Sequence, residues 1–228
     1  RIVTHRQLIL PQLSGPGIAA YKVKKRSGFK IIYGPIKATD LPTFLDSGLK
    51  ATPEMRLKTF TIKERTVLVP VELVSALKWS FFIIPVFFFL SGLGGQAGFW
   101  ASALNNGIFA SVAMLCAVVA GTVLTPILLP WLPGRAFSVK GLTMGFIASL
   151  ILVAFRFNSI GAWQGRLEMV GWLLLIPAVS AFVAMNFTGA STYTSLSGVR
   201  KEMKWAVPLQ VVGAMLGTGF WLASRFVA

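Results

Sequence analysis

The chain has 228 residues, of which 55% are hydrophobic and only 13% are charged, and its mean hydropathy is +0.72. This composition is typical of an integral membrane protein and excludes an ordinary soluble domain. The formal net charge is +15, and thirteen of the 22 Lys and Arg residues precede Glu72. A basic segment beside a membrane indicates contact with anionic lipid head groups or with an acidic partner. No nucleic-acid-binding motif accompanies the charge, so nucleic acid is not expected as a partner.

Residues 1–60 show the alternation of a parallel α/β sheet. Residues 7–13 (QLILPQL) predict a short buried strand, and residues 18–26 have helical spacing, with Gly28 suited to end that helix. Residues 29–33 predict a second strand. A short helix is expected over residues 40–46, with Thr39 as its N-cap and Gly48 after its end.

Ligands of parallel sheets bind at the carboxyl ends of the strands. The rim of a cofactor site is therefore expected at two turns, formed by Gln12, Leu13, Ser14, Gly15, Pro16 and Gly17 after the first strand and by Gly34, Pro35 and Ile36 after the second. Ordinary βα turns are the alternative favoured by spacing alone, since Gly and Pro are common there. In the functional alternative, Gly15 and Gly17 let the backbone approach a large flat or phosphate-bearing cofactor.

Two strands are too few to enclose a core, and domains below about 70 residues are marginal. The fold class expected is therefore an incomplete α/β domain with a parallel sheet (residues 1–60), a connecting helix (61–78) and an all-α transmembrane bundle (79–228). Residue 1 is Arg and no signal-peptide pattern is present, so we expect that it is not the native start and that residues 1–60 are the C-terminal part of a larger cytoplasmic domain.

The 56 residues from Trp79 to Gly134 contain no Asp, Glu, Lys or Arg. About 20 apolar residues cross a bilayer, so this stretch predicts two spans, broken at residues 91–95 and again at 105–107. Five transmembrane helices are predicted in all, over residues 74–93, 108–129, 140–157, 168–187 and 207–227. Gly213, Gly217 and Gly219 with Ala214 offer a small-residue face for close helix packing.

The segment that leads into the first span contains a capping-box pattern, with Thr61 as N-cap and Glu64 three residues later. Pro70 is expected to kink this helix or to split it from the first span. A strand at residues 66–69 is the competing interpretation. None of the five predicted spans has an ionisable residue near its middle, which favours a membrane anchor over a transport path.

Loop charges favour a cytoplasmic N-terminal portion, in a cell inner membrane, with the C-terminus outside. On that assignment the inner loops contain Arg135, Lys140, Arg200, Lys201 and Lys204, and the outer segments contain Arg156, Arg166 and Arg225. Cys116 is the one cysteine and His5 the one histidine, so disulfide frameworks and Cys/His metal patterns are excluded. Cys116 is interpreted as a buried small side chain.

Several short segments resemble the corrinoid-binding domain of corrinoid iron–sulfur proteins, a family that includes the corrinoid subunit of acetyl-CoA synthase and membrane-bound mercury-methylating corrinoid proteins. They lie at residues 5–13 (HRQLILPQL), 15–17 (GPG), 25–29 (KRSGF), 33–36 (YGPI), 38–42 (ATDLP) and 51–56 (ATPEMR). The resemblance covers most of residues 4–78 in sequence, and the membrane-bound members also join such a domain to five membrane helices.

The resemblance implies a corrinoid-dependent methyltransferase that holds a cobalt corrinoid (cobalamin-like) and passes a methyl group to Hg(II), forming methylmercury. It implies membrane lipids, a ferredoxin-like iron–sulfur electron donor and a methyl-donor methyltransferase as partners, and the nine turn residues as cofactor contacts. The family's cap helix, Asn-Val-Trp-Cys-Ala-Ala-Gly-Lys, whose cysteine binds the cobalt, is absent here. No catalytic residue and no metal ligand are therefore expected in this chain, and enzyme activity is expected only when the chain is completed at its N-terminus.

Three alternatives stay open. The chain could be a degenerate homologue instead of a fragment. The methyl acceptor could belong to one-carbon metabolism in the acetyl-CoA pathway. In a third class of function, the protein is a non-enzymatic membrane scaffold or transporter with a cytoplasmic appendage.

Overall fold

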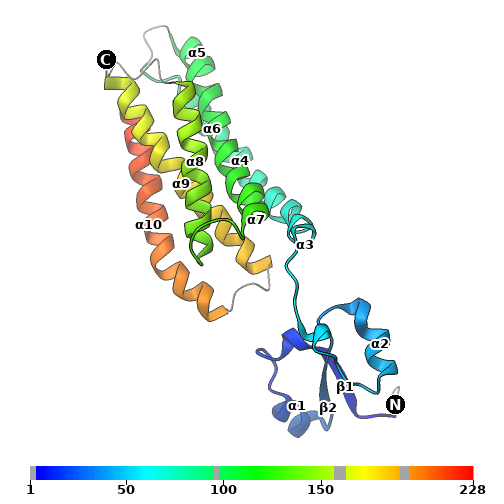
Figure 1. The fold of residues 1–228 in the computed structure, drawn as a ribbon. Coiled ribbons are helices and arrows are strands. Elements are labelled where there is room, and N and C mark those ends of the chain that lie inside the picture. Colours follow the sequence, from blue (N-terminus) through cyan, green and yellow to red (C-terminus); the bar gives the residue numbers. More distant parts are fainter. Residues whose placement is uncertain (1–3, 95–97, 157–162, 191–195, 228) are drawn as a thin grey trace. The chain divides into compact units, whose positions relative to one another are not determined.

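The computed structural model describes residues 4–94, 98–156, 163–190 and 196–227. The chain divides into two compact units, an N-terminal unit (Arg1–Phe60) and a helical unit (Thr61–Ala228). The N-terminal unit contains a two-stranded parallel sheet with short helices, and the helical unit is a bundle of long helices (Figure 1).

In the N-terminal unit, β1 (Gln7–Pro11) pairs in parallel with β2 (Lys30–Gly34), so that Pro11 lies opposite Gly34. The connection contains α1 (Ala20–Ser27), which ends at Gly28 with a left-handed φ of 75°, as predicted. β1 is shorter than predicted, because residues 12–14 form a 3-10 turn (η1). The Ser14 hydroxyl donates to the Pro11 carbonyl at 2.7 Å and stabilises this turn.

A second 3-10 turn, η2 (Ala38–Asp40), leads directly into α2 (Leu41–Asp46). The predicted N-cap Thr39 is wrong, since Asp40 holds that position and no side chain caps the helix. A further 3-10 turn, η3 (Glu54–Arg56), follows. Phe44 of α2, Met55 of η3 and Pro35 are buried among the described residues of this unit, so its core is small.

The helical unit contains five helical segments that are long and apolar enough to cross a membrane. They are Ile62–Leu90, Phe99–Leu128, Phe137–Phe155, Trp163–Phe187 and Gly198–Ala223. Their elements are α3 (Ile62–Thr66), α4 (Val69–Leu90), α5 (Phe99–Ser102), η4 (Ala103–Gly107), α6 (Ile108–Val119), η5 (Ala120–Leu124), α7 (Thr125–Leu128), α8 (Phe137–Phe155), α9 (Trp163–Ala190) and α10 (Leu196–Ala223).

The start of the first segment agrees with the features predicted for it from the sequence. Thr61 and Glu64 form the predicted capping box, in which each side chain accepts a hydrogen bond from the other residue's backbone N–H. Pro70 lies in the first turn of α4, where a proline is tolerated because the N–H that it lacks would have no partner within the helix. It thus marks the start of α4 after α3, as the sequence predicts. The alternative strand at residues 66–69 is wrong.

The second segment departs from the prediction. A break was expected at residues 105–107, but the chain stays helical from Phe99 and passes through a π-helical turn, η4. A second π-helical turn, η5, precedes Pro126, whose ring lacks the N–H that an α-helix would use. Thr125 donates its hydroxyl to the Ala120 carbonyl at 2.7 Å within this turn.

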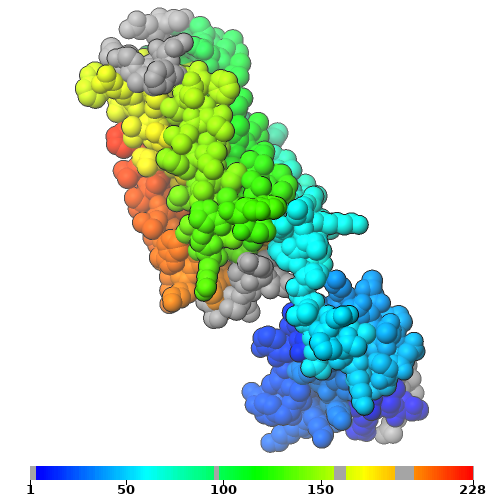
Figure 2. All heavy atoms as spheres, viewed as in Figure 1, coloured from blue at the N-terminus to red at the C-terminus, as the bar shows by residue number. Residues whose placement is uncertain are grey.

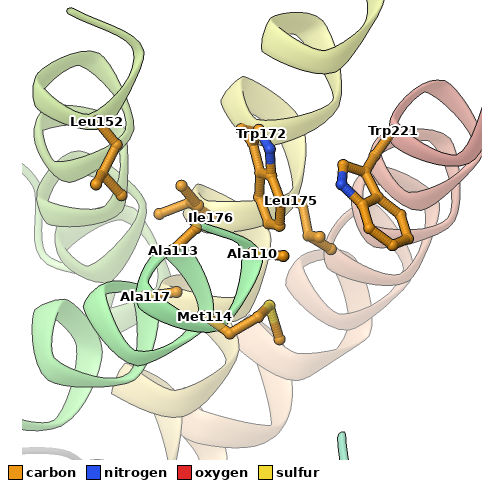
Figure 3. Packing of buried hydrophobic residues seen from close by; sticks show 9 residues of the cluster. All are labelled: Ala110, Ala113, Met114, Ala117, Leu152, Trp172, Leu175, Ile176 and Trp221. Atoms are coloured by element: carbon orange, nitrogen blue, oxygen red, sulfur yellow. The ribbon is translucent and has the colours of Figure 1, made fainter. Parts of the chain in front are cut away.

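Helix α9 lies at the centre of the bundle, and α6, α8 and α10 pack against it. Trp172, Leu175 and Ile176 of α9 point toward small residues of α6 and toward Trp221 of α10 (Figure 3). Side chains fill the spaces between the ribbons on the face in view (Figure 2). The core therefore combines large side chains of α9 and α10 with the alanines of α6.

Glycines allow the closest helix approaches. A Cβ on Gly141 of α8 would lie 2.8 Å from the Ser180 carbonyl oxygen of α9. A Cβ on Gly217 of α10 would lie 2.8 Å from the Leu175 nitrogen, whereas one on Gly219 would meet nothing within 4 Å. Of the three glycines predicted as a packing face on α10, Gly217 is thus the one that the close contact requires.

Candidate functional site

The two predicted cofactor turns lie at one edge of the sheet. Pro11 and Gly34 are opposite each other in parallel strands, so the segments that follow them, Gln12–Gly17 and Gly34–Ile36, leave from the same side. The Tyr33 hydroxyl donates to the Ile18 carbonyl at 2.9 Å and ties the second strand to the end of the first turn. We call this surface the strand-end edge.

The first turn is the accessible part of the strand-end edge. Leu13 is 44% exposed, and Pro16 and Gly17 are also exposed. Gln12, Ser14 and Gly15 are half-buried, and the Ser14 hydroxyl is already engaged with the Pro11 carbonyl. The turn therefore offers an apolar side chain and open backbone to a ligand.

The two glycines of this turn differ in what surrounds them. A Cβ on Gly15 would lie 3.3 Å from the Gln12 carbonyl oxygen, tighter than most such contacts. A Cβ on Gly17 would meet only the Ser14 carbonyl oxygen, at 3.7 Å. Gly15 is thus constrained by its own turn, whereas Gly17 leaves open space on the edge.

The second turn is mostly occupied by internal packing. Gly34 and Pro35 are buried, and a Cβ on Gly34 would lie 3.1 Å from Ile9 Cγ2 and 3.4 Å from the Phe44 ring. The Ile36 amide donates to the Met55 carbonyl at 3.0 Å. These residues hold the edge in shape, and a ligand would meet the first turn before it met them.

The strand-end edge leaves room for a ligand beside Gly17, but neither of its two turns contains a His, Cys, Asp or Glu side chain. His5 precedes β1 and so lies at the opposite end of the strand from the turns. Cys116 lies in α6 of the helical unit. Among the residues that the structure describes, no group of three or more His, Cys, Asp or Glu side chains could hold a metal ion.

Comparison with protein-family models, curated proteins and solved structures finds no match to this chain.

A second polar site, which the sequence analysis missed, lies at one end of the helical unit. The Glu168 carboxylate of α9 lies 3.2 Å from Arg156 Nη1, at the end of α8, and 2.7 Å from Arg225 Nη2, after α10. Trp172 Nε1 donates to the same carboxylate at 3.4 Å. Arg156 also donates to the Asn106 side chain at 3.2 Å. We call this set of contacts the Glu168 network.

The Glu168 network is largely shielded from solvent. The side chains of Arg225 and Glu168 are 1% and 8% exposed, and Arg225 Nη1 has no hydrogen-bond partner among the described residues. The guanidinium of Arg225 also lies 5.8 Å from the Trp221 ring centre, and that of Arg156 lies 4.4 Å from the Phe109 ring centre. Two cations and one carboxylate thus join α6, α8, α9 and α10.

The sequence contained a signal for this network. Antiparallel spans place the end of the third, the start of the fourth and the end of the fifth on the same side. A charge occurs at each of these three points, at Arg156, Glu168 and Arg225. Topology alone could therefore have grouped them.

At the other end of the bundle, buried charges pair with backbone groups. Arg65 donates to the Pro126 carbonyl at 3.2 Å and Lys140 to the Leu129 carbonyl at 2.6 Å, so both cations lie at the C-terminal end of α7. The Glu202 carboxylate accepts from the Ser138 amide at 2.7 Å, in the first turn of α8. Cations at the C-terminal end of a helix and a carboxylate at the N-terminal end of a helix both interact favourably with the helix dipole. These contacts therefore stabilise the fold.

Proposed function

We propose that this chain is part of a membrane-anchored, corrinoid-dependent methyltransferase that passes a methyl group from a cobalt corrinoid to Hg(II). The observation that carries the proposal is the parallel pairing of β1 with β2. It brings the two family-like turns, Gln12–Gly17 and Gly34–Ile36, to one edge of the sheet. When bound, the cobalt centre would supply the methyl-transfer chemistry, and Leu13–Gly17 would form part of the wall around it.

The remaining features agree with an anchor. Five helices that could cross a membrane follow the N-terminal unit, and we assign them to a cell inner membrane with the N-terminal unit in the cytoplasm. The three basic residues in the last turn of α1, Lys24, Lys25 and Arg26, are exposed and would face an acidic partner. A ferredoxin-like electron donor and a methyl-donor methyltransferase are the partners proposed.

The test uses the full product of the native gene, with whatever precedes Arg1, loaded with hydroxocobalamin. Gly17→Leu is the informative variant, because the Gly17 position has space for a side chain that would project onto the edge. We expect the wild type to retain a corrinoid absorption spectrum and Gly17→Leu to lose most of it while staying folded. Gly17→Ala, a smaller addition, should fall between them.

Three outcomes would each contradict one part of the proposal. A full-length protein that stays colourless after loading would show that it does not bind a corrinoid. An equal spectrum in wild type and Gly17→Leu would show that the strand-end edge is not part of the corrinoid site. A corrinoid-loaded protein that forms no methylmercury from Hg(II) would support corrinoid binding but show that Hg(II) is not the methyl acceptor.

A further inference from the structure

The helical unit contains a groove that the proposed function does not use. It has a volume of about 590 Å³ and is lined by residues of α4, α6, α9 and α10. Its walls are mostly apolar, with Trp79 of α4 and Phe182 of α9 among them, and none of the lining residues is charged. The volume is within the range of small-molecule sites, roughly 300–1,000 Å³.

Gln210 of α10 is the unusual residue of this groove. It is 8% exposed, and its Oε1 has no hydrogen-bond partner among the described residues. Its Nε2 lies 3.2 Å from the Met185 sulfur, a weak acceptor. A buried polar group without a partner is costly, and within a membrane helix no water is at hand to replace the missing partner.

The Gln210 amide favours a hydroxyl group as its partner. Its Nε2 already lies against the Met185 sulfur, so Oε1 is the atom left without a partner, and it needs a donor. A hydroxyl group supplies that donor, whereas an ether oxygen only accepts. A hydrocarbon chain offers no donor, and a charged head group would find no opposite charge in the lining.

The depth of Gln210 agrees with a lipid lying in one leaflet. Lys204 and Trp205 precede it on α10, and six residues of helix correspond to about 9 Å. Lys78 and Trp79 mark the same side of the bundle on α4. Lys and Trp are typical of the membrane–water boundary, so Gln210 lies a short distance inside it.

We propose that the groove between α4 and α10 binds an uncharged lipid that bears a hydroxyl group, with the hydroxyl paired to the Gln210 amide. The hydrocarbon part of this lipid lies against Ile83 and Phe182. The inference concerns the helical unit alone and does not depend on corrinoid binding.

The test uses the full chain in phosphatidylcholine vesicles and a hexadecanol with a mid-chain diazirine, compared with its methyl ether. The ether has the same chain but cannot donate a hydrogen bond. We expect the alcohol to label groove peptides saturably and roughly 2- to 10-fold more than the ether, the range that one hydrogen bond supplies. Gln210→Leu should lower labelling by the alcohol to the level of the ether. Gln164→Leu, outside the groove lining, should change nothing.

Equal labelling by alcohol and ether, or an undiminished signal in Gln210→Leu, would overturn the proposal. So would a diazirine phosphatidylcholine that labels the groove peptides as strongly as the alcohol does. If Gln210→Leu fails to fold, Gln210→Met preserves the side-chain length. In that case hexadecanol should raise the Tm of the wild type and leave that of Gln210→Met unchanged, and an equal rise in both would contradict the assignment.

Discussion

At the scale of single residues, Arg225 depends on one carboxylate. Its guanidinium lies 2.7 Å from Glu168 and is 1% exposed, so the charge has no access to water. Arg156, the second partner of Glu168, is 21% exposed and donates to the Asn105 carbonyl and the Asn106 side chain as well. Removing Glu168 therefore affects the two arginines unequally.

We expect Glu168→Gln to destabilise the helical unit by about 3–5 kcal/mol, the range measured when one partner of a buried ion pair is removed. The reason is the uncompensated charge on Arg225. Chemical unfolding of the detergent-solubilised protein, followed by circular dichroism, measures the change in the free energy of unfolding.

A double variant supplies the control. Arg225→Met removes the stranded charge, so the double variant Glu168→Gln/Arg225→Met should lose clearly less stability than the sum of the two single variants. Additive losses, or a Glu168→Gln protein as stable as the wild type, would show that the network does not hold the helices together.

Tyr33 acts on the strand-end edge through its hydroxyl. We expect Tyr33→Phe to cost about 1 kcal/mol and to loosen residues 12–18, because the hydrogen bond to the Ile18 carbonyl is lost. Hydrogen exchange of the turn amides should become faster. Tyr21→Phe is the matched control, since Tyr21 is 71% exposed and should leave exchange unchanged. Equal exchange in both variants would mean that the turn does not need Tyr33.

At the scale of elements, two glycines of α10 allow a direct comparison of a tightly packed position with an open one. A valine at position 217 would place its Cβ 2.8 Å from the Leu175 nitrogen, whereas one at position 219 would meet nothing within 4 Å. Gly217→Val should therefore separate α10 from α9 and lower the Tm by several degrees, while Gly219→Val should stay close to the wild type. Helix propensity changes equally in both, so similar Tm values would refute the packing argument.

The helices were predictable to different degrees. The capping box at Thr61 follows from local residue types, and the structure has it. The first span was predicted to end at residue 93 but ends at Leu90, directly before the break predicted at residues 91–95. The helical turn through Asn105 and Asn106 was not predictable, because a π-helical turn keeps polar residues helical where their types favour a break. Asn106 is also held by Arg156, 50 positions away, and this tertiary contact overrides local preference.

The sites were less predictable than the helices. The parallel rhythm of residues 7–34 is enough to group the two turns at one edge, but it cannot show that Gly34 serves contacts with Ile9 and Phe44. Gln210 could not be recognised from the sequence, because what distinguishes it is a buried Oε1 without a hydrogen-bond partner among the described residues. Packing decides both cases.

At the scale of the whole molecule, five helices in the described part of the chain are long and apolar enough to cross a membrane, and five crossings would place the two ends of the helical unit on opposite sides. We predict that, in a Cys116→Ala background, a cysteine at position 227 reacts with a membrane-impermeant maleimide in intact cells and one at position 50 does not. This direction is the one that the excess of Lys and Arg in the loops on the N-terminal side favours. Labelling at both positions, or the reverse pattern, would contradict the assigned topology.

The parallel strands have one further consequence at this scale. Within the described residues, β1 and β2 pair only with each other, so each has one side of backbone N–H and C=O groups without a neighbouring strand. Leu8 of β1 is 42% exposed beside that open side. Such edges recruit strands from other molecules. A preparation truncated at Phe60 should therefore aggregate on concentration, and a charged substitution at Leu8 should keep it monodisperse in size-exclusion chromatography.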